Sequence, residues 1–202
     1  MTSRPLLALL AASLLFAPAL RAAPLAPDQQ AVHVLNRLAF GPRPGDVERV
    51  QRMGVQQYID EQLHPESIPM PPELSARLDA LETVKRSAGA ALGDYLELRK
   101  EVRNEEEGAK QRRRIEQGRA MREEAEARLL RAVESPRQLE EVMVDFWFNH
   151  FNVFAGKGID RALVASYERD AIRPYALGSF RALLGATAKH PAMLFYLDNV
   201  VS

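Results

Sequence analysis

The sequence contains no cysteine, one tryptophan and no excess of charge of either sign. The absence of cysteine excludes disulfide scaffolds and metal sites built from thiolates. Because 27 basic residues are balanced by 27 acidic residues, the composition also argues against the broad basic surface that binds nucleic acid. Hydrophobic residues make up 47% of the 202 residues, which is enough to bury a core and excludes disorder of the whole chain.

The longest uncharged run lies near the N-terminus and is short for a permanent membrane anchor. It extends over the 16 residues from Pro5 to Leu20, whereas a membrane-spanning helix takes about 20 apolar residues. Arg4 precedes the run, and small residues follow it at Ala22 and Ala23, which is the layout of a secretory signal peptide. A retained anchor or a buried N-terminal helix is the alternative interpretation.

We therefore predict a cleaved signal peptide over residues 1–22 and a mature helical domain over residues 23–202. Cleavage removes two arginines and no acid, so the mature chain carries 25 basic and 27 acidic residues, a net charge of −2. This prediction places the protein in the periplasm or outside the cell, without a stable transmembrane anchor and without a nucleic acid as partner.

Apolar residues recur at helical spacing over most of the remaining chain, and no stretch alternates with period two for long enough to form a strand. The pattern predicts helices over 28–39, 46–53, 55–63, 74–84, 136–154, 160–172, 179–187 and 191–197. Glycine and proline lie between several of them. The fold class is therefore all-α, an irregular bundle of many helices.

Capping residues set the starts of the later helices. Ser135 and Gln138, with a proline between them, have the spacing of a capping box. Asp160 and Ser179 are each expected to cap the helix that follows, and Pro191 is expected to open the last one.

Residues 97–131 differ from the rest, because 20 of these 35 residues are charged, 9 acidic and 11 basic. Such a segment buries little surface. It is either an exposed helix with many ion pairs or a partly disordered insertion broken near Gly108 and Gly118. The three arginines at 112–114 could form an anion site, but acids on both sides favour a solvated face.

The densest group of aromatic and polar residues extends from Asp145 to Phe154, in the order Asp-Phe-Trp-Phe-Asn-His-Phe-Asn-Val-Phe. On a helix, Trp147 and Phe151 share one face, while Asp145 and Asn149 share another. His150 follows a phenylalanine by four residues, so we expect its imidazole beside or within the apolar side.

Two interpretations remain open for these polar residues. In the first, His150 and His190 approach each other with Asp145 or Asp198 and form an acid–base pair or a metal site. The catalytic candidates are Asp145, Asn149, His150, His190 and Asp198, and the metal candidates among them are His150, His190 and Asp198. In the second, the histidine and asparagine are satisfied polar groups of the core. No metalloprotease, EF-hand, nucleophile-elbow or phosphate-loop motif is present in the sequence.

Three separated segments resemble a known family. They are His33–Pro42 (His-Val-Leu-Asn-Arg-Leu-Ala-Phe-Gly-Pro), Asp145–Val153, and His190–Asn199 (His-Pro-Ala-Met-Leu-Phe-Tyr-Leu-Asp-Asn). By these segments the chain resembles the N-terminal part of the bacterial domain-of-unknown-function 1800 family. The resemblance implies an exported, mostly helical bacterial protein of uncharacterised activity, so the cofactor remains unknown.

Family members usually continue into a segment with the patterns Asn-Glu-Asn-x-x-Ala-Arg-Glu and Glu-Leu-His. The resemblance therefore implies that this chain is a fragment or truncated copy, and that the missing segment would complete any polar site. The alternative hypothesis is a non-enzymatic interaction module, in which the charged segment 97–131 binds a protein partner in the cell envelope.

Overall fold

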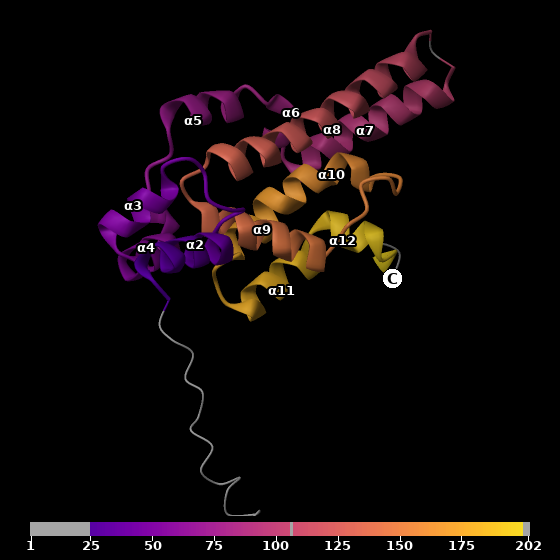
Figure 1. The fold of residues 1–202 in the computed structure, drawn as a ribbon. Coiled ribbons are helices and arrows are strands. Elements are labelled where there is room, and N and C mark those ends of the chain that lie inside the picture. The colour runs from indigo at the N-terminus through magenta and orange to yellow at the C-terminus, as the bar shows by residue number, and fades with distance from the viewer. Residues whose placement is uncertain (1–24, 106, 200–202) are drawn as a thin grey trace, which may run out of the picture.

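The computed structural model describes residues 25–105 and 107–199, and every regular element in these two ranges is a helix (Figure 1). The α-helices are α2 (Pro27–Leu38), α3 (Asp46–Met53), α4 (Val55–Leu63), α5 (Pro72–Asp79), α6 (Glu82–Lys85), α7 (Ala88–Arg103), α8 (Ala109–Glu134), α9 (Gln138–His150), α10 (Asp160–Tyr167), α11 (Phe180–Lys189) and α12 (Pro191–Tyr196). Single turns are η1 (Pro65–Ser67), the π turn η2 (Glu168–Ile172) and η3 (Arg173–Tyr175). The all-α prediction is confirmed for these residues. The predicted signal peptide, residues 1–22, lies outside them.

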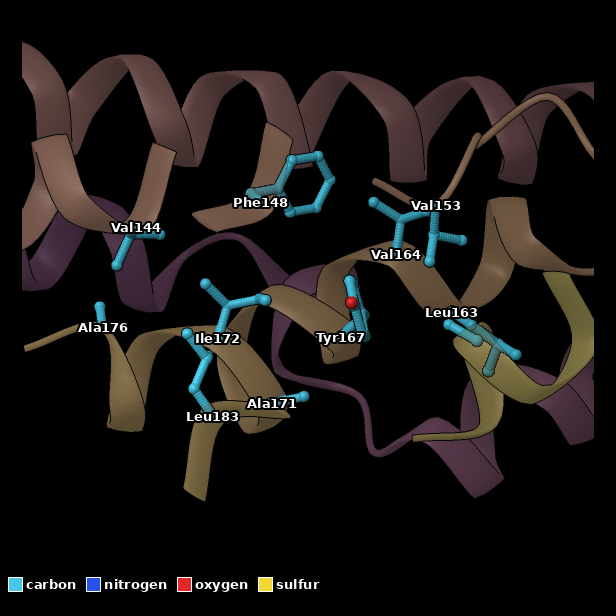
Figure 2. Close-up of a cluster of buried hydrophobic side chains, with 11 residues drawn as sticks. Val144, Phe148, Val153, Leu163, Val164, Tyr167, Ala171, Ile172, Ala176 and Leu183 are labelled. Atoms are coloured by element: carbon cyan, nitrogen blue, oxygen red, sulfur yellow. The ribbon is translucent and has the colours of Figure 1, made fainter. Parts of the chain in front are cut away.

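The main apolar core lies between α9, α10, η2, α11 and α12 (Figure 2). Leu163, Tyr167 and Ile172 are fully buried at its centre, and they pack with Val144 of α9 and Leu183 of α11. Burying side chains of this size contributes about 1.5–3 kcal/mol each, so this core dominates the packing energy of the C-terminal half. No helix of residues 25–105 and 107–199 combines the length and the apolar character needed to cross a bilayer.

Two smaller cores hold the N-terminal half. In the first, α2 packs against α3 and α4 through Leu35, Val50 and Tyr58, all fully buried. In the second, Leu74 of α5 packs against Leu130 in the C-terminal part of α8. Helix α8 therefore connects the N-terminal helices with the main core.

The side chains of two buried glutamines connect α4 and the residues after α2 to the start of α9 by hydrogen bonds. The side chain of Gln62 accepts a hydrogen bond from the Leu139 N–H (3.1 Å) and donates to the Pro136 carbonyl (3.0 Å). The side chain of Gln138 accepts from the Phe40 N–H (3.3 Å) and donates to the Ser135 carbonyl (2.8 Å). The predicted capping box is therefore wrong, because Gln138 is the first residue of α9 and its amide bonds the incoming backbone instead.

Helix α9 ends at His150, four residues before the predicted end near Phe154. Phe151 leaves the helical region, and its carbonyl oxygen accepts a hydrogen bond from the Tyr167 hydroxyl (2.9 Å). A buried tyrosine needs a partner for its hydroxyl, so this bond stabilises the helix end. Asn152 and Phe154 consequently lie in the following loop rather than in the predicted helix 136–154.

The charged segment forms the paired helices α7 and α8, which project beyond the rest of the molecule (Figure 1). In the described residues the segment takes the ion-paired helical form, with a pair between Arg112 of α8 and Glu101 of α7 (2.7 Å). Gly108 precedes α8 with a φ of +73°, which favours glycine, so one helix does not continue through it. The predicted break at Gly118 is wrong, since this residue lies inside α8.

Two predicted helices are divided in the structure. The segment 74–84 forms α5 and α6, separated by Ala80 and Leu81. The segment 160–172 is α-helical only to Tyr167 and continues as the π turn. The predicted cap at Ser179 is confirmed, because its hydroxyl accepts a hydrogen bond from the Ala182 N–H (3.2 Å).

Asp160 does not cap α10 with its side chain but is the first residue of that helix. It is 1% exposed, and its Oδ1 has no hydrogen-bond partner among the described residues. Burial disfavours the charged carboxylate and raises the pKa of Asp160 from its ordinary 3.8 to about 6, although Lys157 opposes the shift. The folded state therefore binds a proton to Asp160 more readily than the unfolded state does.

We predict that Asp160→Asn stabilises the protein at pH 7 and that this gain depends on pH. The pKa of Asp160 is higher in the folded state than in the unfolded state, so the ionised carboxylate lowers the free energy of unfolding. This loss of stability grows as pH rises from 4 to about 6. Urea unfolding of both proteins, followed by circular dichroism at several pH values, measures the difference. If the free energies of unfolding of the variant and the parent differ by the same amount at pH 4 and pH 7, the prediction is wrong.

Candidate functional site

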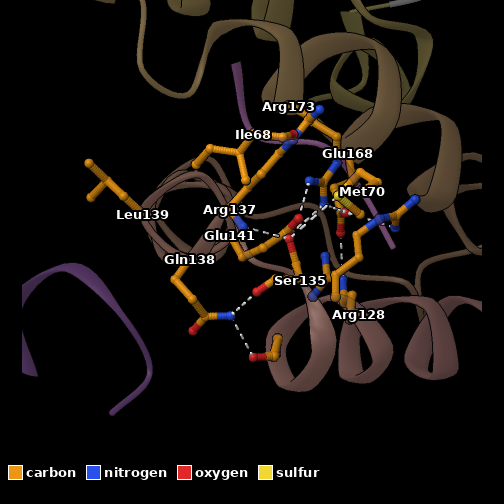
Figure 3. Close-up of polar contacts among 12 residues, drawn as sticks. Ile68, Met70, Arg128, Ser135, Arg137, Gln138, Leu139, Glu141, Glu168 and Arg173 are labelled. Carbon is orange, nitrogen blue, oxygen red and sulfur yellow. Dashed lines mark hydrogen bonds and ion pairs between the residues drawn. The ribbon is translucent and has the colours of Figure 1, made fainter. Parts of the chain in front are cut away.

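Arg173, whose side chain is only 18% exposed, joins two buried glutamates, one on α9 and one in the π turn (Figure 3). The Arg173 guanidinium donates to both carboxylate oxygens of Glu141 (2.9 Å each) and to Glu168 Oε1 (3.0 Å). Its planar fork matches a carboxylate with two parallel hydrogen bonds, which lysine does not provide. These three side chains are largely removed from water and carry a net charge of −1.

The π turn brings two members of this group together. In η2 the Arg173 N–H donates to the Glu168 carbonyl, five residues earlier in the chain. The wider turn places side chains five residues apart on nearly the same side, whereas an α-helix would rotate them well apart. The departure from α-helix after Tyr167 is therefore linked to the Arg173–Glu168 ion pair.

Helix α8 supplies further arginines to the same group. Arg128 Nε donates to Glu168 Oε2 (2.7 Å), and the Arg128 guanidinium lies over the Phe148 ring, 3.6 Å from its centroid. Arg131 lies 3.9 Å from Glu168 Oε1. Through the carboxylate of Glu168 and the ring of Phe148, Arg128 fixes α8 against both the π turn and α9.

The central charges of this group are fixed near neutral pH. Burial alone would raise the pKa of Glu168, but Arg173 and Arg128 outweigh burial and hold the pKa below its ordinary value. Burial alone would lower the pKa of Arg173, but Glu141 and Glu168 raise the pKa above its ordinary value. A general acid or base works best with a pKa near the working pH, so Glu168 and Arg173 are suited to fixed electrostatics rather than to proton transfer.

A pocket of about 260 Å³ adjoins the charged group. Its apolar walls include Phe40, Leu129 and Val144, and its polar lining includes Asp145 together with Arg128, Glu141, Glu168 and Arg173. Phe40 is 52% exposed and Asp145 is also exposed, although both residues belong to the motifs that carry the family resemblance. Apolar walls with a few placed polar groups are typical of ligand sites. This pocket is the candidate functional site.

Three predicted site residues lie on α9 but have different surroundings. Asp145 lines the pocket, while Asn149 donates from Nδ2 to the Asp145 carbonyl (2.8 Å). His150 stacks on Phe146 with ring centroids 6.0 Å apart and meets Trp147 edge-on at 5.7 Å. The expected position of His150 beside the aromatic residues is confirmed, but its side chain is exposed rather than within the core.

The other two predicted residues lie at opposite ends of α12. His190 is buried and caps this helix, because its Nδ1 accepts a hydrogen bond from the Ala192 N–H (3.2 Å). Burial lowers the pKa of His190 and keeps the imidazole neutral, as this cap requires. Asp198 is exposed and pairs with Lys157 (3.3 Å).

Among residues 25–105 and 107–199, no group of three or more histidine, aspartate or glutamate side chains is placed to hold a metal ion. The structure thus distributes the five predicted residues over α9 and the two ends of α12. Of these five residues, only Asp145 lines the pocket beside the charged group. The catalytic and metal-binding roles of the five residues stay predictions.

The sequence reasoning missed the buried charges. One signal was available on α9, where Glu141 precedes Asp145 by four residues and therefore lies near the same face. Helical periodicity places Glu168 within a regular helix over 160–172 and Arg173 directly after its end. A π turn has no sequence signature that would have paired Glu168 with Arg173.

The sequence profile of a family described as "Protein of unknown function (DUF1800)" matches residues 33–202, which include all three motifs. No curated protein and no solved structure matches the chain.

We predict that Arg173→Gln lowers the free energy of unfolding by about 3–5 kcal/mol, because it leaves Glu141 and Glu168 buried without their main partner. Arg77→Gln is the matched control, since it removes the half-exposed pair with Glu134 and should cost only about 0–1 kcal/mol. Urea unfolding at pH 7 measures both values.

The difference in free energy of unfolding between the parent and Arg173→Gln should become smaller as pH falls below the ordinary glutamate pKa of 4.5. In the parent protein Glu168 has a lowered pKa, so its stabilising contribution is lost at acid pH, while protonation relieves the unpaired carboxylates of the variant. If Arg173→Gln and Arg77→Gln lower the free energy of unfolding equally, Arg173 does not have a central role.

Proposed function

The chain belongs to the DUF1800 family, and because that family is described only as proteins of unknown function, we propose a function from the chain's own geometry. In this proposal the protein is exported and binds a small amine with an apolar body in the pocket between α8 and α9. The observation that carries the proposal is that Phe40 and Asp145, from two separate family motifs, line one pocket beside a fixed charged group.

The charges of the pocket favour a cation. Its lining includes three carboxylates and two guanidiniums, an excess of one negative charge. Glu141 and Glu168 are bound to Arg173, whereas Asp145 forms no ion pair with any residue in the described ranges. A ligand ammonium would therefore bind at Asp145, where a charge-assisted hydrogen bond is available.

The walls of the pocket favour an apolar body on the same ligand. Phe40, Leu129 and Val144 present apolar surface to the pocket, and an aromatic ring next to a carboxylate also attracts a cation through its face. Because Glu168 and Arg173 keep their charges, we propose that these two residues orient the ligand without exchanging protons with it.

We predict that 2-phenylethylamine binds to the protein and that 3-phenylpropionate, which has a similar body and the opposite charge, does not. Asp145→Asn should weaken amine binding about tenfold, equivalent to ~1.4 kcal/mol. Asp79→Asn, at an exposed aspartate that does not line the pocket, should leave the affinity unchanged. Isothermal titration calorimetry measures the affinities.

Phe40→Ala should also weaken amine binding, because it removes one apolar wall. Equal binding of the amine and the carboxylate, or an unchanged affinity of Asp145→Asn, would show that the pocket does not select a cation.

Export is the second part of the proposal. The supporting features are Arg4, the uncharged run from Pro5 to Leu20 and the small residues after it. A pocket of this kind would then meet ligands in the periplasm or outside the cell.

We predict that bacteria producing the full chain export it to the periplasm and cleave the signal peptide at or close to residue 22. Mass spectrometry of the fractionated protein determines the new N-terminus. Replacing Leu9 and Leu10 by arginine should interrupt the apolar run and keep the full-length chain in the cytosol. An unprocessed parent chain in the cytosol would refute export.

A further inference from the structure

The projecting pair of α7 and α8 carries a groove of about 450 Å³ along its length. Four carboxylates and two guanidiniums line the groove, so it has an excess of two negative charges. Arg86 is shared between Asp94 (3.2 Å) and Glu116 (2.5 Å), and Arg112 pairs with Glu101. Glu97 is exposed and forms no ion pair with the rest of the described chain.

The groove also contains apolar surface. Ile115 of α8 is 59% exposed, and the half-buried Leu98 of α7 lies in the same groove. An exposed isoleucine is ordinary by itself, but this one lies in a concave surface whose lining has four carboxylates against two guanidiniums. The groove therefore combines an apolar strip with an acidic border.

The two helices hold this groove in a defined shape. On α7, Tyr95 lies under the guanidinium of Arg113 from α8, 5.5 Å from ring centroid to the guanidinium carbon. At the base of the pair, Arg161 of α10 donates to Gln117 of α8 (3.1 Å). A preformed surface loses little conformational entropy when a partner binds.

We infer that this groove binds a basic amphipathic helix of another protein in the cell envelope. The apolar stripe of such a helix would cover Ile115 and Leu98, and lysine or arginine on either side of the stripe would meet Glu97 and the other acids. The negative excess disfavours nucleic acids and anionic lipid surfaces, so the partner is a protein segment. This interaction neither requires nor excludes the amine pocket.

The test uses the purified full chain and a fluorescein-labelled synthetic peptide of 15 residues, with leucine at helical spacing and lysine at the other positions. Fluorescence anisotropy should show binding that weakens with added salt, because opposite charges meet across the interface. A peptide of the same composition in scrambled order, and a peptide with glutamate in place of lysine, should bind at least tenfold more weakly.

Two variants with matched controls locate the site. Glu97→Lys should weaken binding about tenfold, whereas Glu126→Lys, at an exposed glutamate of α8 outside the groove, should not. Ile115→Ser should also weaken binding about tenfold, whereas Met121→Ser, at an exposed methionine of the same helix, should not. Circular dichroism checks that all four variants remain folded.

Three results would overturn the inference. They are no binding of the amphipathic peptide, equal binding of the scrambled peptide, or an equal loss of peptide affinity in the groove variants and their controls. Equal binding of the scrambled peptide would mean attraction by charge alone, without recognition by the groove.

Discussion

The ion pairs of Arg173 with Glu141 and Glu168 are the constraint on which the central part of the molecule depends. Removing three charges from water costs several kcal/mol for each ion, and only close and simultaneous contacts offset this cost. Helix α9, the π turn and η3 must therefore keep one relative position. Arg128 adds α8 to the same arrangement through its contacts with Glu168 and Phe148.

This constraint also explains where the pocket lies. The charged group forms one side of the pocket between α8 and α9, and Phe40, whose N–H donates to the Gln138 side chain, forms part of its apolar wall. The apolar cores on either side are closed by leucine, valine and tyrosine. A polar interior beside these cores leaves room for a ligand without opening the main core.

Local rules predicted the elements that depend on local chemistry. Glycine at 54 and Ser179 set helix ends as expected, because the φ of a glycine and the cap of a serine are determined by a few neighbouring residues. The end of α9 depends on Tyr167, sixteen residues later, and so helical periodicity alone overextended it. The charged group depends on a π turn and on three separate elements, which no local pattern reveals. Asp145 was identified from its motif, whereas its partners in the pocket required the fold.

The pocket and the groove lie on different parts of one helix. The pocket includes Arg128 and Leu129 of α8, while the groove includes Arg112 and Ile115. Sixteen residues of α-helix correspond to about 24 Å, roughly three times the Debye length at physiological salt. Charge at one site is therefore screened from the other. Coupling between the two sites would have to pass through a displacement of α8, and its C-terminal part is fixed by Arg128, Arg131 and the packing against α5. We therefore expect the amine and the basic helix to bind independently.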